Sequence, residues 1–477
     1  MNKAFLAATS LMTLVLAACA QWEGVVSQSA MTDANTLKIA ATTDGVPTSS
    51  PWPATDWWRD YRDEQLDQLI SEGLNGSPAL KVAAARIRRA TATAGLIESG
   101  LYPRLNGSAD SVYQRFTENG LYPPPFAGEV RTTNRLALDG LYSFDFWGGR
   151  EAEFRSALGT QHANEVDGEA ARWDLTAAIA QAYARLAGEF DQLDIGNDQL
   201  RQKKEIRTLS EKLVRAGLVT EVESQQAAAA IAATEAEISL TEERIALVKQ
   251  RLSALVGSGP DRGQTIHRPR LALAPPAGLP SDLPAELIGR RPDIVAQRWR
   301  IEAAAKAVDA GQAAFYPNVN LSAMFGFQSI GAEQVLRAGS LIGGIGPAIS
   351  LPIFDAGRLR NTLAQADADL DMFVEQYNGA VAGAVQDVVG QLTSWRFNQA
   401  ALERESVALS HLEKAYRLAV LRYREGLISY LTVLSAEGEL IAHRRKEAES
   451  RNRQFVISIA LIHALGGGFA PRSIPPS

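Results

Sequence analysis

Apolar positions in the middle of this 477-residue chain repeat with a spacing of seven, which is typical of a coiled coil. Two such registers run in parallel, three positions apart. Their members are Ile231, Ile238, Ile245 and Leu252, followed by Thr234, Thr241, Val248 and Leu255. A sustained seven-residue repeat predicts helices that supercoil with a left hand. The alanines around this seam allow neighbouring helices to approach closely.

Proline is absent from residues 126–259 and from residues 353–470. Because proline breaks a helix, these two stretches are where long helices can form. A helix of ~50 residues would extend ~75 Å at 1.5 Å per residue, which is too long for a globular interior. A soluble antiparallel bundle is the alternative interpretation, and periodicity alone does not exclude it.

Four shorter stretches alternate between apolar residues and small or polar ones, which is the pattern of a β-strand. Alternation over roughly 10 residues, with one apolar face, is typical of a transmembrane strand. It is clear at Leu136, Leu138, Phe325 and Ile349, and weak from Leu105 to Phe116. We predict strands at about 103–116, 132–146, 317–330 and 341–354.

Four strands are too few to close a sheet on itself within lipid. The smallest barrels of this kind have about eight strands, and an open edge leaves unpaired backbone groups that cost several kcal/mol each. The missing neighbours must therefore come from other copies of the chain. This hydrogen-bond argument predicts a homo-oligomer without fixing the number of subunits.

The chain contains an internal duplication. Landmarks around the first strand of each half recur at a spacing of 214 positions, and the match needs no gap. The matched pairs are Pro78 and Pro292, Tyr102 and Tyr316, Pro103 and Pro317, and Asn106 and Asn320. A fused duplication predicts two equivalent structural units that pack pseudo-symmetrically.

The N-terminus reads as a secretion signal. Lys3 supplies the positive charge, and the apolar segment that ends at Leu16 is too short to span a membrane. Leu16-Ala17-Ala18-Cys19 resembles a bacterial lipobox, in which the cysteine thiol carries a diacylglycerol after cleavage. Ala20 follows the cysteine rather than an aspartate, which by resemblance to sorted lipoproteins favours the outer membrane. An ordinary signal peptide with an incidental cysteine is the alternative.

These observations divide the chain into six segments. They are a signal peptide (1–18), a lipidated tether (19–55), a first repeat (56–259), a linker (260–290), a second repeat (291–468) and a tail (469–477).

The composition of the chain argues against an enzyme, a metal-binding protein or a nucleic-acid-binding protein. The net charge of −6 disfavours nucleic acid as a partner, and the single cysteine excludes a disulfide within the chain. The five histidines show no metal-ligand spacing, and no glycine loop has phosphate-binding form. We therefore expect no enzymatic activity, no metal and no cofactor apart from a covalent lipid on Cys19.

Taken together, the motifs resemble those of the TolC-type outer membrane factors, and specifically the lipoprotein branch that serves efflux pumps. The motifs that carry the resemblance are Tyr102-Pro103, Tyr316-Pro317, Phe144 to Arg150, Leu351 to Arg358, the Gly-Leu pairs at 217 and 426, and Ala464 to Gly468. The resemblance implies an α+β membrane protein: a homotrimer with a shared 12-stranded β-barrel, four strands from each chain, continued by a long helical coiled-coil barrel. It also implies a passive exit duct for small molecules such as drugs. The duct would be lipid-anchored in the outer membrane, extend into the periplasm, dock onto a periplasmic membrane-fusion adaptor, and reach an inner-membrane pump directly or through that adaptor.

The resemblance assigns two sets of residues. The turns after the long helices would contact the adaptor through Arg215, Gly217, Leu218, Arg424, Gly426 and Leu427. A periplasmic gate would lie at Tyr423, Leu431 and Ser435, where related ducts carry aromatic, leucine and acidic side chains. Ser435 departs from that pattern, and Glu437 is turned about 200° away from it on a helix. Ordinary packing between helices is the alternative role for Tyr423 and Leu431.

Aromatic residues at the end of the second strand, among them Tyr142, Phe146 and Trp147, suit a girdle at the membrane interface, with packing beside the barrel as the alternative. Three other functions stay open. The same duct could serve type I protein secretion. The chain could instead be a periplasmic adaptor, although adaptors have one hairpin, or a soluble helical lipoprotein with a structural role.

Overall fold

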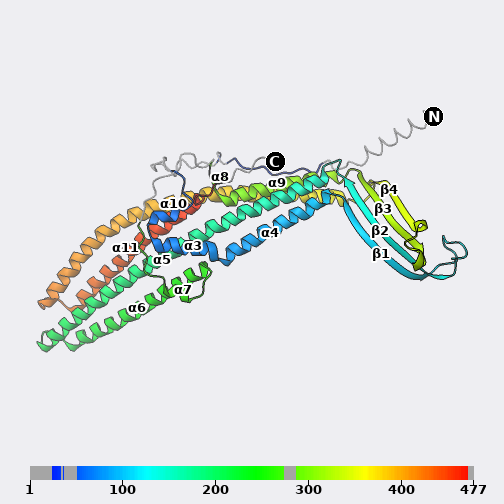
Figure 1. Ribbon diagram of the computed structural model, residues 1–477. Helices are drawn as coiled ribbons and strands as arrows, with labels where there is room; N and C mark the ends of the chain where they lie inside the picture. The colour runs from blue at the N-terminus through cyan, green and yellow to red at the C-terminus, as the bar shows by residue number, and fades with distance from the viewer. Residues whose placement is uncertain (1–23, 34–35, 37–50, 273–285, 471–477) are drawn as a thin grey trace. The chain divides into compact units, whose positions relative to one another are not determined.

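The computed structural model describes residues 24–33, 36, 51–272 and 286–470 (Figure 1). The predicted signal peptide and Cys19 lie outside the described residues. So do residues 37–50 of the predicted tether, 273–285 of the linker and 471–477 of the tail.

The elements occur twice in the same order. The first copy consists of α4 (Pro78–Glu98), β1 (Arg104–Arg115), β2 (Val130–Phe144), α5 (Gly149–Arg215) and α6 (Glu221–Leu255). The second consists of α9 (Pro292–Ala313), β3 (Asn318–Ile330), β4 (Leu341–Ser350), α10 (Arg358–Arg424) and α11 (Tyr430–Ala464). The two long helices have 67 residues each and their partners 35 each, so the tandem repeat is confirmed.

Short elements complete the order. They are the 3-10 helices η2 (Trp57–Tyr61), η3 (Ser99–Leu101), η4 (Ala332–Gln334) and η5 (Ala338–Ser340), and the helices α3 (Glu64–Gly76), α7 (Asp261–Gln264) and α8 (Leu287–Arg290).

The chain forms two compact units. Unit 1 contains Arg86–Asn164 and Gln297–Tyr377 with the N-terminal segment up to Met31. Unit 2 contains Thr32–Ala85, Glu165–Ala296 and Asn378–Ser477. Unit 1 therefore holds the sheet, and unit 2 holds both turns that follow the long helices.

The sheet of unit 1 is antiparallel and has the order β1-β2-β3-β4 (Figure 1). The two copies of the repeat meet in the middle of the sheet, where β2 of the first copy pairs with β3 of the second and Leu138 lies opposite Phe325. The fourth strand ends at Ser350 rather than near 354. Pro352 has no N–H to donate to a ladder, which explains the earlier end. The second strand runs from 130 to 144 rather than from 132 to 146.

The main core of unit 2 is built around the N-terminal helices. Trp57 and Tyr61 of η2 and Leu66, Leu69 and Ile70 of α3 are buried against apolar residues of α5, α6 and α11. Asp63 caps α3 by accepting a hydrogen bond from the backbone N–H of Gln65 at 3.0 Å. The same carboxylate accepts the hydroxyl hydrogen of Tyr183 on α5 at 3.0 Å, which ties the cap to the core.

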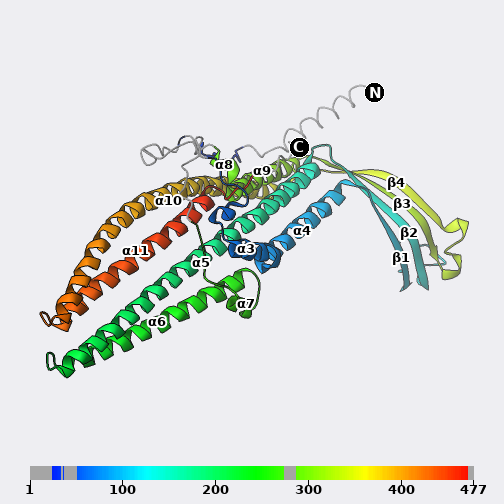
Figure 2. The same cartoon turned by 60° about the vertical axis from the view of Figure 1, so that its left-hand side comes forward.

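The predicted seam lies where the seven-residue pattern placed it. Ile231, Thr234, Thr241, Ile245 and Leu252 are buried on α6, and the remaining members are half-buried. Figure 2 shows α6 running beside α5 as one hairpin and α11 beside α10 as the other. The coiled-coil prediction is confirmed.

The three glycines after α11 bring the end of this helix into close contact with two other segments of unit 2. Gly466, Gly467 and Gly468 all have positive φ, at 90°, 55° and 80°. A Cβ at Gly466 would lie 2.0 Å from the carbonyl oxygen of Arg290, and one at Gly468 would lie 2.2 Å from that of Ala54. Only glycine combines this backbone conformation with so close an approach of two other segments.

Within the described part of the chain, every helix is either too short or too polar to cross a membrane.

Candidate functional site

The sheet has two chemically different faces. On one face, cross-strand neighbours are apolar and most of them are exposed: Leu136 lies opposite the half-buried Phe327, Leu138 opposite Phe325, and Ile345 is 75% exposed. Exposed apolar patches of this kind mark a surface that meets lipid or protein rather than water.

The other face is small and polar. Arg135 donates hydrogen bonds to the Ser108 hydroxyl at 2.8 Å and to the Asp139 carboxylate at 2.5 Å, and Ser108 donates to Asp139 at 3.1 Å. Gly326 of β3 lies close to β2, and a Cβ there would lie 2.2 Å from the carbonyl oxygen of Leu136. The apolar face and the polar face therefore match the alternation in the sequence.

The outer edges of β1 and β4 have no partner strand among the described residues. The exposed apolar face extends to both edges. If water formed hydrogen bonds with the unpaired backbone groups of these edges, the apolar face would be in water as well. A strand with free N–H and C=O groups is a template for pairing with another chain.

Aromatic side chains gather at the end of β2. Trp147 stacks on Tyr316, with ring centroids 4.6 Å apart and planes at 18°, and its indole N–H donates to the carbonyl oxygen of Pro317 at 2.9 Å. Phe146 is exposed and stacks on Phe144 at 5.5 Å. Tyr142 meets Phe144 edge to face at 4.9 Å. The interfacial girdle stays a prediction, and these contacts give the ring of Trp147 a fixed orientation.

The two turns after the long helices have the same geometry. Gly217 and Gly426 each have φ of 72°. The N–H of Leu218 donates to the carbonyl oxygen of Leu213 at 3.0 Å, and that of Leu427 to Arg422 at 2.9 Å, which are helix-ending bonds around a left-handed glycine. Arg215 and Arg424 are exposed beside these glycines. The turn forces both leucines outward, at 66% and 71% exposure, so each tip presents an apolar residue to its surroundings.

The residues of the predicted gate lie in different environments. Tyr423 of α10 is buried; its hydroxyl is 2.8 Å from the Ser210 hydroxyl of α5 and donates to the Glu223 carboxylate of α6 at 3.1 Å. This burial raises the pKa of Tyr423. Leu431 and Ser435 of α11 are exposed. Tyr423 thus joins three helices, as the packing alternative for this residue supposes, and the gate assignment stays a prediction.

One charged contact near the tips was not anticipated from the sequence. Lys203 of α5 and Glu437 of α11 form an ion pair at 3.3 Å, and both side chains are buried. Desolvation raises the pKa of Glu437, and the nearby Lys203 ammonium opposes that rise. One carboxylate oxygen of Glu437 and the hydroxyl of Tyr430 are buried without a hydrogen-bond partner. The expectation that Glu437 faces away from Ser435 is confirmed.

The sequence contains a pattern from which the burial of Lys203 could have been predicted. Lys203, Ile206, Ser210 and Leu213 are spaced by three, four and three, which is the spacing of a buried helical stripe, and all four are buried. A lysine inside such a stripe indicates a buried partner.

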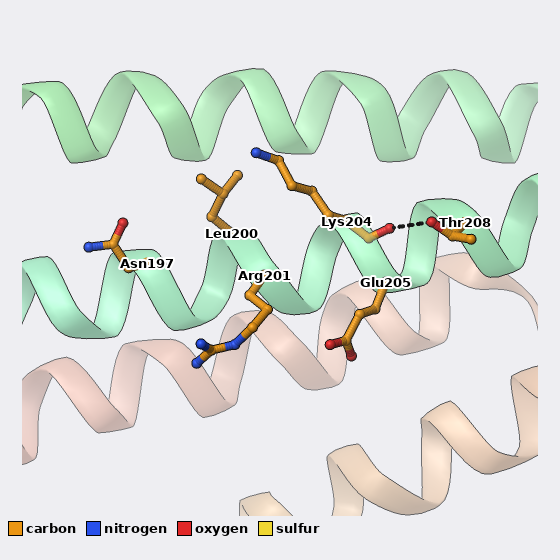
Figure 3. A pocket seen from close by; sticks show the side chains of 6 residues that line it. All are labelled: Asn197, Leu200, Arg201, Lys204, Glu205 and Thr208. Atoms are coloured by element: carbon orange, nitrogen blue, oxygen red, sulfur yellow. Dashed lines mark hydrogen bonds between the residues drawn. The ribbon is translucent and has the colours of Figure 1, made fainter.

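The outer surface of α5 at this level carries ordinary solvated charge. A depression of about 400 Å³ is lined by Asn197, Leu200, Arg201, Lys204, Glu205 and Thr208. Figure 3 shows these six side chains along α5. Lys204 pairs with Glu235 of α6 at 3.2 Å, with both side chains more than half exposed. All lining residues come from one helix face, so the depression encloses no ligand-sized site.

The described residues contain no group of three or more His, Cys, Asp or Glu side chains arranged to hold a metal ion.

Two stretches of the chain, residues 69–258 and 283–467, match the family model described as outer membrane efflux protein. The fusaric acid resistance protein FusA of Burkholderia cepacia is 38% identical over 359 residues, which cover 75% of this chain and 68% of FusA. The multidrug resistance outer membrane protein MdtP of Escherichia coli strain K12 is 30% identical over 433 residues, covering 88% of both proteins.

Solved structures agree with the sequence matches. The outer membrane protein VceC of Vibrio cholerae superposes with a TM-score of 0.82 at 37% identity, over 88% of this chain and all of VceC. The outer-membrane channel OprN superposes with a TM-score of 0.83 at 27% identity, over 94% of this chain and 97% of OprN.

Proposed function

Since this chain belongs to the outer membrane efflux protein family, we propose that three copies form a passive exit duct through which small molecules such as drugs leave the cell. The protein is the outer-membrane component of an efflux system. The observation that carries the proposal is the four-stranded sheet with one exposed apolar face and two free edges.

The free edges of the sheet support an assembly of several copies. A four-stranded sheet placed in lipid leaves the backbone groups of β1 and β4 without partners, and each unpaired group costs several kcal/mol. Pairing β4 of one copy with β1 of the next removes every edge once the ring closes. Three copies give twelve strands, within the range of known outer-membrane barrels. The exposed apolar face would meet lipid, and the face carrying Arg135 and Asp139 would line the water-filled interior.

We propose that the chain is anchored by a lipid on Cys19. Support comes from the segment that follows it. The backbone N–H groups of Gln28 and Ser29 both donate to the Asp371 carboxylate at 3.0 Å, and the Ser27 hydroxyl donates to it at 2.6 Å. The chain is thus bound to α10 eight residues after Cys19. Replacing Cys19 by Ser should weaken retention in the outer membrane and leave the trimer intact; loss of assembly would contradict a tether role.

The partners we propose are a periplasmic adaptor at the two turns and an inner-membrane pump that supplies the energy. Exposed Leu218 and Leu427 on matched turns support the first, because apolar side chains held outward at a helix tip suit docking onto another helical hairpin. The named activities of FusA and MdtP support small toxic compounds as cargo rather than proteins. The family is one of channel proteins rather than enzymes, and we propose that this chain performs no catalysis.

The test is reconstitution. Purified protein added to planar lipid bilayers should give discrete current steps. In the double variant Tyr423→Phe, Glu223→Gln the contacts among α5, α6 and α10 are weaker, and the current steps should be larger. Protein that stays in detergent solution, or that enters the bilayer and conducts in neither form, would contradict the duct.

A further inference from the structure

The helices of unit 1 enclose a groove of about 880 Å³ that is lined by four of them: α4, α5, α9 and α10. These helices are neighbours in that order. Arg150 of α5 donates to the carbonyl oxygen of Gly100, just after α4, at 2.6 Å. A Cβ at Gly159 of α5 would lie 3.0 Å from Ala303 of α9, and one at Gly311 of α9 would lie 3.2 Å from Leu363 of α10.

The groove is therefore on the concave face of a curved layer. Each of α4, α5 and α10 contributes exposed side chains to it, so it is an open surface rather than the core of a bundle. Its floor is made of small residues: Ala90, Ala157, Ala307, Ala310, Gly311 and Ala366.

Charge is segregated across this groove. Between residues 78 and 97, α4 carries only basic residues, namely Lys81, Arg86, Arg88 and Arg89. Between residues 361 and 377, α10 carries only acidic ones, namely Asp367, Asp369, Asp371 and Glu375. Those that line the groove are Arg86 and Arg89 on one side and Asp369 on the other, with Glu153 of α5 between them.

The charged side chains that line the groove are available to bind a ligand. Arg86, Arg89, Glu153 and Asp369 take part in no ion pair within the part of the chain that the structure describes. Neighbouring helices pack about 8–10 Å apart, and three such spacings separate α4 from α10 along the layer. This exceeds the screening length of about 8 Å at physiological salt, and the two sides therefore act on a ligand independently.

We propose that this groove is a transit site that sorts small amphiphilic organic ions by sign, with anionic groups held at Arg86 and Arg89 and cationic groups at Asp369. The proposal rests on the duct function, which places the concave face toward the lumen. Guanidinium groups bind carboxylates in a bidentate manner, and the alanine floor leaves room for an apolar body. Contacts this exposed are weak, which suits a conduit because cargo must leave as readily as it enters.

Cysteine accessibility measures the sign of the potential directly. Cys19 is the only cysteine, so Cys19→Ser gives a silent background into which Thr93→Cys on α4 or Gln365→Cys on α10 is introduced. Both positions line the groove. Each protein is treated at about 0.15 M ionic strength, where the screening length is about 8 Å, with a methanethiosulfonate bearing a sulfonate or one bearing a trimethylammonium group, and the ratio of the two rates is recorded.

The anionic reagent should be favoured at position 93 and the cationic reagent at position 365. The double change Arg86→Gln and Arg89→Gln should lower the ratio at 93 roughly threefold or more and leave 365 unchanged, since screening confines the effect. Asp369→Asn should act at 365 only. Arg88→Gln and Asp367→Asn are controls that remove one positive and one negative charge, respectively, from outside the lining. Sodium benzoate should slow the anionic reagent at 93, and the neutral benzamide should not.

Equal ratios at the two positions, an equal effect of Arg88→Gln, or failure of both cysteines to react in folded protein would overturn the proposal. The mass of the assembly, measured on the same samples, separates this from the duct itself. Monomeric protein with opposite preferences at 93 and 365 would refute the duct, and with it the transit role, although the two sides of the groove would still differ in the sign of their potential. A trimer without such preferences would refute the groove alone.

Discussion

Lys203 of α5 and Glu437 of α11 form an ion pair of 3.3 Å with side chains only 9% and 6% exposed. The pair joins the long helix of the first repeat to the short helix of the second, so it spans the duplication near the turns. Burying two charges is costly, and their attraction compensates only while both are present.

Removing one partner should therefore be much worse than removing both. Lys203→Met should lower stability by about 3 kcal/mol, whereas Lys203→Met combined with Glu437→Leu should restore or exceed the parent value. Thermal denaturation followed by circular dichroism measures both. The control is Lys204→Met, whose pair with Glu235 is more than half exposed on both sides, and which should cost about 0–1 kcal/mol. Equal losses from the two lysine changes would show that burial of the pair is unimportant.

The same pair predicts a pH dependence. Desolvation raises the pKa of Glu437, so between the ordinary glutamate pKa and the raised one the folded protein holds a proton that the unfolded chain releases. This contribution to stability is complete below the ordinary pKa and is lost as pH rises through the raised pKa. Lys203→Met removes the group that opposes the rise, so its melting temperature should fall more steeply than the parent's from pH 4.5 upward. Adding Glu437→Gln should abolish the extra slope, and parallel curves for all three proteins would contradict the assignment.

The sequence predicted the seam and the strands because their side chains repeat locally, as Ile231 and Ile245 do at a multiple of seven. It did not reveal Lys203, because a search for apolar periodicity passes over a charged residue in the same stripe. Its partner is 234 positions away, and no local pattern reports such a contact. The groove was invisible for a related reason, since Arg86 and Asp369 share a surface only after four helices are laid side by side.

Tyr423 shows what assignment by resemblance does not provide, namely the surroundings of the side chain. Position along the chain grouped it with Leu431 and Ser435, but the helical rotation buries the tyrosine against Ser210 and Glu223 and leaves the other two in solvent. A residue's direction from its helix depends on the neighbouring helices, and the sequence of α10 alone does not contain them.

The turns should be needed for docking and dispensable for folding. Leu218→Asp together with Leu427→Asp should leave the free energy of unfolding within about 0.5 kcal/mol of the parent value, because surface changes rarely do more. Binding to the adaptor, measured by interferometry with immobilised adaptor, should fall at least tenfold. Leu121→Asp, at a position 99% exposed in the loop between β1 and β2, is the matched control and should bind normally. Unchanged binding of the double variant would remove the turns from the contact.

The C-terminal glycines should be intolerant of any side chain. Gly466→Ala would bring a Cβ within 2.0 Å of the Arg290 carbonyl oxygen at a φ of 90°, so we expect a loss of about 3 kcal/mol or failure to accumulate. Gly438→Ala, inside α11 with no atom within 4 Å of the added carbon, should instead stabilise by about 0.5–1 kcal/mol. Comparable expression and melting of the two variants would show that the closure of unit 2 by these glycines is not required.

The central claim is that the four strands of one chain are completed by those of identical chains. Native mass spectrometry of protein extracted in mild detergent tests it most directly. We predict one dominant species with three times the mass of the single chain, which dissociates on heating. A folded, single-chain species that retains its strand content in lipid would contradict the claim.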